Sequence, residues 1–355
     1  MNGFIILRKF NIFFIFLLTS VLILYLGAGF LKPFLFAVFL SALMRPVGNF
    51  MEKSGVNRIL SSLICVLVVF IIISGLLIFI TRYLAELRQD LPYFREQFDN
   101  LIQYIHKLLS QKFGITREAQ EGFIDERSDD FRYGLELWIR NFLAGLASTF
   151  LSFLIILVYV FLLLLNRDEY EEFILLYAKE NKREQLKSVI DRTSTIAQKY
   201  LWGRIKVMTL LGIMYIITFL IFDLKHALLL TLFGALVTVI PYFGPFISGV
   251  LPMVMALLTM NNMSTILLFS VIVLTIQLIE SYVLEPWILG AEVHLRPLSI
   301  IIAIILGGML WGIPGMVLFV PIFAIIKIIC DQIDSLKPIG FLLGKTPITK
   351  PKNSL

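Results

Sequence analysis

The sequence contains few of the side chains on which soluble enzymes and metal proteins depend. Of its 355 residues only 16% are charged, two are cysteine and three are histidine. Cys65 and Cys330 both lie inside hydrophobic runs, so neither a disulfide framework nor a reactive thiolate is indicated. The histidines lie far apart, and no Cys/His spacing typical of a transition-metal site occurs. We therefore expect no metal and no cofactor.

The sequence also lacks the short motifs of hydrolytic chemistry. It contains no Walker-type phosphate loop, no nucleophile elbow and no His-Glu-x-x-His. The motifs needed for ATP hydrolysis and for hydrolysis within the membrane are therefore absent from the sequence, and we predict that the protein is not an enzyme. The formal net charge is +6, but lysine and arginine are scattered between apolar runs and form no stripe with aromatic residues. We expect no nucleic-acid partner.

Long apolar runs are abundant instead, and hydrophobic residues make up 58% of the chain. Such runs predict an all-α, polytopic membrane helix bundle, because a helix needs about 20 apolar residues to cross the hydrocarbon core. Four runs meet that length: 10–30, 59–80, 142–165 and 266–283. Residues 207–222 are somewhat short, and residues 33–44 are shorter still and would form a tilted or half-length segment. An uncleaved N-terminal anchor fits the first run better than a signal peptide.

Two later runs, 227–260 and 298–329, are too long for one crossing and contain proline and glycine near their middles. We expect both to be broken or re-entrant helices. Within a bilayer, broken backbone is tolerated only where protein or a water-filled cavity satisfies the freed polar groups. Both breaks should therefore lie in the interior of the molecule.

The distribution of lysine and arginine between the runs predicts the topology, because cytoplasmic loops carry an excess of them. Both termini are expected in the cytoplasm of a bacterial cell, and the protein in the inner membrane. The predicted segments are N-terminal spans (1–81), an amphipathic extracytoplasmic helical segment (82–140), one span (141–166), a cytoplasmic amphipathic helix (167–206), a C-terminal membrane domain with helix breaks (207–330) and a cytoplasmic tail (331–355).

Each extramembrane segment contains an apolar stripe at helical spacing. The external stripe runs from Leu87 to Leu108, and the internal stripe from Leu186 to Leu201. One interpretation is that these helices pack on their own membrane domain. The alternative is that a stripe pairs with a copy of itself and builds a homo-oligomer.

The first candidate functional element is the break in residues 240–252. Its prolines remove backbone donors and its glycines loosen the helix, so carbonyl groups should be exposed near a solute or ion site. A simple kink or tight turn is the alternative. The candidate residues are Pro241, Tyr242, Gly244, Pro245, Gly249 and Pro252.

The second candidate is the acidic end of the run 266–283. Glu280 lies about one helical turn inside that run, where an ionisable group costs a few kcal/mol unless it is paired or hydrated. Gln277 lies three residues earlier and neighbours Glu280 on the helix surface. Glu285 precedes Pro286, so we expect it to mark the helix end at the membrane interface. Interfacial solvation or a structural ion pair is the alternative for both acids.

The third candidate is the glycine-rich centre of the run 298–329. Gly308 and Gly312 form a small-xxx-small face that allows close helix packing, and the following Gly-Ile-Pro-Gly unit should open the helix. Close packing alone explains the pattern, and a second half-helix opposite the first break is the functional alternative. The residues concerned are Gly308, Gly312, Pro314, Gly315 and Pro321.

These motifs resemble the autoinducer-2 exporter (AI-2E) family of bacterial permeases. The likeness rests on the Pro-Tyr-Phe-Gly-Pro unit at 241–245, on Glu280 with Pro286, and on the Gly-Ile-Pro-Gly unit at 312–315. The resemblance implies about eight membrane segments and self-association. It also implies a group that includes exporters of the quorum signal and cation/proton antiporters, with other relatives tied to sporulation.

The leading hypothesis is a secondary transporter that moves a small polar, autoinducer-2-like solute across the inner membrane without ATP hydrolysis. In this reading the 241–252 break and Glu280 lie near the path, with the lipid bilayer as surroundings. One alternative is Na⁺(Li⁺)/H⁺ antiport, in which a buried carboxylate exchanges a monovalent cation and a proton. Another is a non-transporting membrane scaffold, although a scaffold has no need of Glu280 or of two helix breaks.

Overall fold

The computed structural model describes residues 18–89, 150–240, 243–260, 262–288 and 295–344, with scattered residues between 11 and 15 and between 92 and 145. This described part is almost entirely helical, with one isolated bridge of extended backbone between Leu295 and Gly344. It contains five helices that are long and apolar enough to cross a bilayer, or six with one bent pair. The predicted all-α polytopic fold is confirmed, and the total of about eight segments stays a prediction.

The long apolar helices contain most of the runs singled out in the sequence. They are α2 (Ala28–Lys53), α3 (Arg58–Gln89), α7 (Arg183–Ile221), α13 (Ile313–Gln332) and the helix Met263–Ile288. The bent pair consists of the helix Phe150–Leu165 and α6 (Arg167–Leu176), which meet at 68°. The runs 59–80 and 266–283 therefore lie within continuous helices, as predicted, and the run 207–222 lies in α7 up to Ile221.

The N-terminal region differs from the expected pair of segments. A turn at Gly27 ends the helical stretch 18–26, and α2 then continues from Ala28 to Lys53 with Pro33 and Pro46 inside it. Residues 28–30 thus belong to the same helix as 33–44, and the predicted boundary between 30 and 33 was wrong. Membrane helices tolerate such internal prolines because neighbouring groups satisfy the freed carbonyls.

The chain forms two compact units, and helices continue from one into the other. Unit 1 consists of Met1–Leu67, Ile155–Lys206 and Glu285–Leu355. Unit 2 consists of Val68–Leu154 and Val207–Leu284. The first part of α3, up to Leu67, therefore belongs to unit 1, and the rest of α3 belongs to unit 2. In the same way, α7 belongs to unit 1 up to Lys206 and to unit 2 from Val207.

A tight helical hairpin dominates the C-terminal part of unit 1. α12 (Pro297–Trp311) and α13 are joined by Gly312 alone, whose φ of 67° and ψ of −144° are accessible to glycine and strained for other residues. The predicted break in 298–329 is therefore present. α14 (Lys337–Leu343) packs against α13, and the short η1 (Glu180–Lys182) precedes α7.

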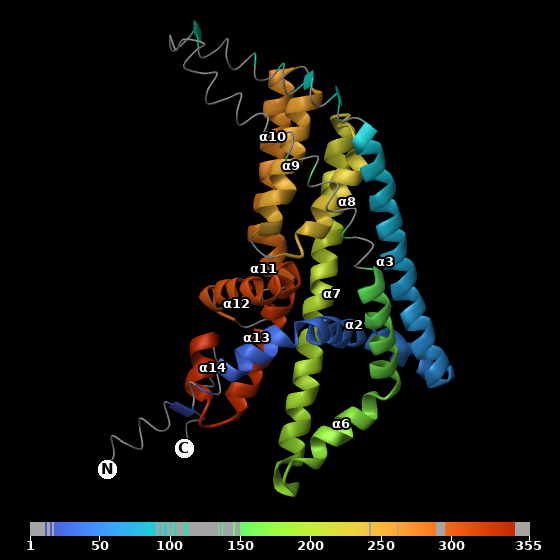
Figure 1. The fold of residues 1–355 in the computed structure, drawn as a ribbon, viewed down its shortest axis with the longest axis vertical. Coiled ribbons are helices and arrows are strands. Elements are labelled where there is room, and N and C mark those ends of the chain that lie inside the picture. Colours follow the sequence, from blue (N-terminus) through green and yellow to red (C-terminus); the bar gives the residue numbers. More distant parts are fainter. Residues whose placement is uncertain are drawn as a thin grey trace, which may run out of the picture. The chain divides into compact units, whose positions relative to one another are not determined.

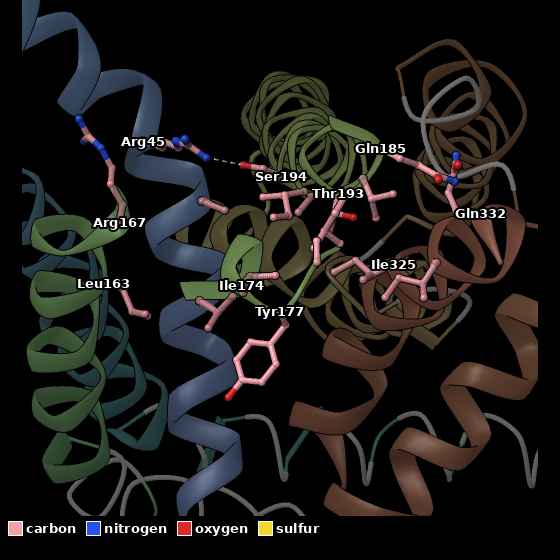
Figure 2. Close-up of a pocket in the computed structure, with 18 of the residues that line it drawn as sticks. Arg45, Leu163, Arg167, Ile174, Tyr177, Gln185, Thr193, Ser194, Ile325 and Gln332 are labelled. Atoms are coloured by element: carbon pink, nitrogen blue, oxygen red, sulfur yellow. Dashed lines mark hydrogen bonds between the residues drawn. The ribbon is translucent and has the colours of Figure 1, made fainter. Parts of the chain in front are cut away.

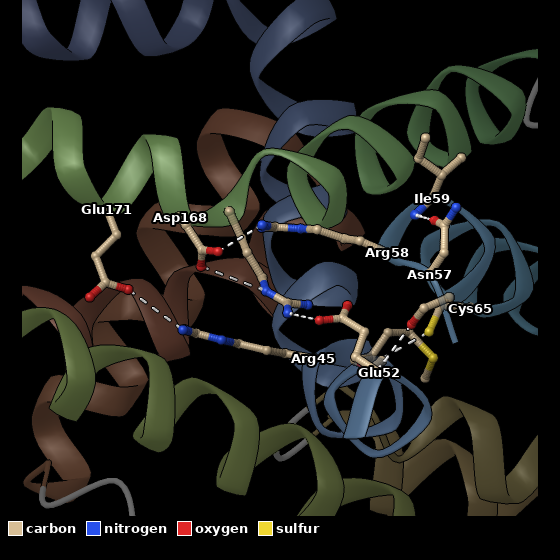
Figure 3. Close-up of polar contacts among 12 residues, drawn as sticks. Arg45, Glu52, Asn57, Arg58, Ile59, Cys65, Asp168 and Glu171 are labelled. Atoms are coloured by element: carbon tan, nitrogen blue, oxygen red, sulfur yellow. Dashed lines mark hydrogen bonds and ion pairs between the residues drawn. The ribbon is translucent and has the colours of Figure 1, made fainter. Parts of the chain in front are cut away.

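Ion pairs connect α6 to α2 and α3 in unit 1 (Figure 3). Arg167 donates to Glu52 at 2.5 Å, Arg58 donates to Asp168 at 2.7 Å, and Arg45 lies 3.6 Å from Glu171. The pair of Arg58 and Asp168 is exposed, and exposed pairs contribute roughly 0–1 kcal/mol each, so we assign these ion pairs mainly the role of fixing the direction of α6.

Unit 2 contains three short helices and the second half of α7, with an aromatic core between α7 and α10. α8 (Ala227–Val237), α9 (Phe243–Thr259) and α10 (Met263–Ile279) pack in sequence, and α9 lies beside both others (Figure 1). α10 begins at the N-cap Asn262, whose side chain accepts from the Ser264 amide at 3.0 Å. The Tyr215 ring stacks on Phe219, the Phe219 ring meets Phe269 at a tilt of 41°, and all three side chains are 0% exposed. α10 continues into the π-helical turn η2 (Glu280–Leu284) and then α11 (Glu285–Ile288).

Candidate functional site

The predicted break in the run 227–260 lies between the end of α8 at Val237 and the start of α9 at Phe243. Gly244 makes this tight connection possible, because a Cβ atom there would lie 2.3 Å from the carbonyl oxygen of Val237 and 2.5 Å from Cα of Thr238. Pro245 occupies the first turn of α9, where a missing N–H costs nothing. Pro241 and Tyr242, both predicted site residues, lie outside the described residues.

α9 itself continues through Pro252, so the predicted irregular stretch is shorter than 241–252. A proline inside a helix removes the hydrogen bond to the carbonyl four residues earlier, which here belongs to Ser248. Ser248 is 0% exposed, and its hydroxyl donates to the Pro245 carbonyl at 3.1 Å. Pro252 therefore leaves a backbone carbonyl without its helical partner beside the buried Ser248 hydroxyl.

Gln277 brings α10 into contact with that polar group. Its Nε2 donates to Oγ of Ser248 at 2.9 Å and to the hydroxyl of Tyr215, which in turn lies 3.3 Å from Oγ of Ser248. The amide oxygen of Gln277 is buried and accepts no hydrogen bond from the described residues. Side chains from α7, α9 and α10 thus form one buried polar cluster with a spare acceptor.

Two glycines make room for this cluster. A Cβ atom on Gly249 of α9 would lie 3.1 Å from Nε2 of Gln277, and one on Gly234 of α8 would lie 3.2 Å from the Tyr215 ring. Both distances are shorter than ordinary van der Waals contact. The predicted residues Gly249 and Gln277 are therefore in direct contact, and this contact requires a small residue at position 249 of α9.

Glu280 follows Gln277 by one helical turn and is 0% exposed. The spacing of three residues puts the carboxylate beside Gln277 on the helix surface, next to the cluster. Burying a carboxylate is expensive unless surrounding groups compensate. Glu280 also begins the π-helical turn η2, a deviation from the α-helix that is frequent at functional sites. We define the polar cluster as Tyr215, Ser248, Gln277 and Glu280.

Glu285 is placed differently from Glu280 and belongs to unit 1. We expected a helix end there, but the helix continues to Ile288, so that expectation was wrong. The π-helical turn before it already interrupts the regular hydrogen-bond ladder, which accommodates Pro286 without ending the helix. Glu285 accepts from Arg204 of α7, whose side chain is only 5% exposed. The structural ion pair, one of the two alternatives for this residue, is the observed arrangement.

The C-terminal glycines and prolines also belong to unit 1 and shape the α12–α13 hairpin. Gly312 is the turn residue, and the closest backbone approach is between Gly307 and Gly315, where a Cβ atom on either would lie within 2.3 Å of the other's carbonyl oxygen. Gly308 packs on Met316 instead. Pro314 occupies the first turn of α13, and Pro321 lies buried within it. Close packing thus accounts for this motif.

Sequence reasoning missed three residues of these sites: Tyr215, Ser248 and Arg204. Tyr215 lies within an apolar run and Ser248 within the break, where the available signal was a hydroxyl group among apolar neighbours. Arg204 was interpreted only as a topology signal. Its partner Glu285 is 81 residues away, and no local pattern connects the two.

The fold and the polar cluster define a multi-pass α-helical membrane protein that keeps ionisable and hydrogen-bonding groups buried among apolar helices. The chain belongs to the AI-2E transporter family, whose model matches residues 12–335. This confirms the resemblance drawn from the motifs and supports a general permease role over that of a scaffold. The family and its relatives carry the names of transporters, not of enzymes.

Three relatives illustrate the match. The chain is 27% identical to the putative transport protein YrrI of Bacillus subtilis over 83% of this chain and 84% of that protein. It is 28% identical to the putative transport protein YueF of Bacillus subtilis, over 83% and 82%. It is 26% identical to the AI-2 transport protein TqsA of Escherichia coli, over 90% of both chains.

Proposed function

We propose that this protein moves a small polar, autoinducer-2-like solute across the bacterial inner membrane without ATP hydrolysis. In this proposal both termini face the cytoplasm and the polar cluster lies on the path. The observation that carries it is the fully buried Glu280 beside Gln277, Tyr215 and Ser248, next to a broken helix. The name of the relative TqsA supports the choice of cargo.

The chemistry of the cluster fits a solute that carries hydroxyl groups. The amide oxygen of Gln277 has free lone pairs, the Glu280 carboxylate is an acceptor when ionised, and the Ser248 and Tyr215 hydroxyls both donate and accept. Such a set can replace the hydration shell of a small polar molecule. Pro252 adds the carbonyl of Ser248 as a further acceptor.

Flux through proteoliposomes tests the proposal directly. Labelled solute efflux is compared for the wild type, Glu280→Gln and the matched control Glu184→Gln, in which an exposed acid of unit 1 is neutralised. We expect the control to retain wild-type flux and Glu280→Gln to lose at least tenfold, because the amide removes the charge and half of the acceptor capacity. Equal flux in all three would remove Glu280 from the mechanism.

A second function, Na⁺(Li⁺)/H⁺ antiport, is favoured by the same buried carboxylate, which can exchange a proton for a monovalent cation. A pH-sensitive dye inside the vesicles separates the two functions. Antiport predicts a rise of internal pH when sodium is added outside, because inward sodium is exchanged for outward protons, and this rise should be abolished in Glu280→Gln. A dye that stays silent on sodium addition, in vesicles that still move the polar solute, rejects antiport.

A further inference from the structure

Unit 1 contains a cavity of about 1040 Å³ that takes no part in the proposed transport site. Its walls come from α2, the helix Phe150–Leu165, α6, the first half of α7 and the end of α13 (Figure 2). Sites for drug-sized ligands usually enclose about 300–1,000 Å³. The cavity therefore has room for a small molecule or for one lipid chain with its headgroup.

One wall of the cavity is the internal apolar stripe of α7. Leu186, Val189, Ile190 and Ala197 line it, with Ile325 and Ile329 of α13 among the remaining apolar lining. The sequence suggested that this stripe either packs on its own membrane domain or pairs with a second copy. Within unit 1 a substantial part of it instead borders open space, so the stripe needs an apolar occupant.

Cations surround the polar part of the lining. Arg45, Arg167, Lys179 and Lys182 line the cavity, against Asp334 as the acid in the same lining. Arg45 donates to Oγ of Ser194 at 3.1 Å and is also held near Glu171, so its guanidinium has a fixed direction (Figure 2). Acids outside the lining already pair with Arg45 and Arg167. The remaining positive surplus comes from Lys179 and Lys182 against Asp334, and together with the aliphatic walls it suits an amphiphilic anion.

We propose that this cavity binds one anionic phospholipid, with an acyl chain along the α7 stripe and the phosphate beside Arg45, Lys179 and Lys182. Anionic lipids of the cytoplasmic leaflet attract basic residues near the membrane surface, and basic pockets between membrane helices bind their headgroups. The topology predicted from lysine and arginine places these residues on that side.

The composition of the lining favours a lipid over other occupants. A soluble organic anion would gain nothing from the aliphatic α7 wall, whereas an acyl chain gains about 0.8 kcal/mol for each CH₂ that it buries. A second copy of the chain would more naturally cover a flat face than enter a cavity formed by five segments of one unit.

Native mass spectrometry of the full-length protein in detergent tests this site. Phosphatidylglycerol and zwitterionic phosphatidylcholine are titrated separately, and the occupancy of the first bound lipid is measured. Wild-type protein should bind phosphatidylglycerol at least fivefold more tightly than phosphatidylcholine. Lys179→Ala with Lys182→Ala should lose most of that preference, whereas the control pair Lys187→Ala with Lys206→Ala, two exposed lysines outside the lining, should keep it.

A second pair of variants tests the apolar half of the site. Thr193→Trp places an indole in the cavity and should reduce binding of both lipids at least fivefold, whereas Thr195→Trp, exposed on the same helix, should not. Circular dichroism confirms that each variant remains helical. Equal lipid occupancy in wild type, the Lys179/Lys182 pair and Thr193→Trp would overturn the proposal.

Competition and assembly complete the test. Displacement of the lipid by glycerol 3-phosphate at equal concentration would identify a soluble anion as the occupant and overturn the lipid assignment. A change of subunit number in Thr193→Trp with unaltered lipid binding would assign the cavity to a second copy instead. Unaltered subunit number together with selective loss of phosphatidylglycerol supports the proposal.

Discussion

Gly249→Val tests whether contact between α9 and α10 builds the polar cluster. The Cβ atom of any larger residue would lie 3.1 Å from Nε2, 3.3 Å from Cγ and 3.4 Å from Cδ of Gln277. Valine adds two methyl groups beyond that atom, so Gln277 must move. Its 2.9 Å hydrogen bond to Ser248 then lengthens or breaks.

The expected magnitude follows from two effects. Overpacking of a filled interior costs about 1–3 kcal/mol. Loss of the hydrogen bond between two buried groups costs roughly another 1 kcal/mol. Gly249→Val should therefore lower the free energy of unfolding by about 2–4 kcal/mol. Gly75→Val is the matched control, because a Cβ atom there meets nothing within 4 Å and the residue is exposed on α3.

Equilibrium unfolding of the detergent-solubilised protein measures both variants, and a double-mutant cycle isolates the contact. Gln277→Ala removes the side chain against which valine would clash, so Gly249→Val should cost at least 1 kcal/mol less in that background. Solute flux in proteoliposomes should fall in Gly249→Val and remain unchanged in Gly75→Val. Equal unfolding free energies for the two valine variants would refute the packing argument, whatever the flux.

Three further outcomes are expected. In thermal unfolding, Glu285→Gln should destabilise the protein more than Arg204→Met. Glu285→Gln leaves the buried Arg204 guanidinium without its ionic partner, at a cost of about 3–5 kcal/mol, whereas Arg204→Met leaves an acid that is 34% exposed and can be hydrated. Gly312→Ala should cost about 1–3 kcal/mol in the same assay, because its backbone conformation is strained for alanine. The hydrogen bond from Lys337, and then its charge, hold the pKa of Asp334 below the ordinary 3.8. The stability that this pair contributes is therefore present above pH 3.8 and lost as the pH falls through the lower folded value. An NMR titration should show the Asp334 midpoint rising in Lys337→Met.

The sequence predicted the features that depend on local chemistry. Proline and glycine marked both helix breaks, and the depth of Glu280 within an apolar run marked it as exceptional. The contacts across helices were not predictable, because a span that is apolar on every side does not reveal which face meets which neighbour. Tyr215 and Gln277 are 62 residues apart, and their hydrogen bond depends on how α7 and α10 pack together. The helix end expected at Glu285 failed because a π-helical turn overrode the local effect of Pro286.

The same residue types produce opposite results in the two broken runs, and the difference explains where polar chemistry can lie. In the α12–α13 hairpin, glycines bring backbone against backbone, and the space between the helices closes around aliphatic and aromatic neighbours such as Phe319. In α9, Gly249 faces a polar side chain, and Pro252 frees a carbonyl beside it. Backbone groups freed inside a bilayer must find partners within the protein. In the proposed function, the freed carbonyl in α9 opposite Gln277 is one of the polar groups offered to a transported solute, whereas a break opposite another glycine supplies only a turn.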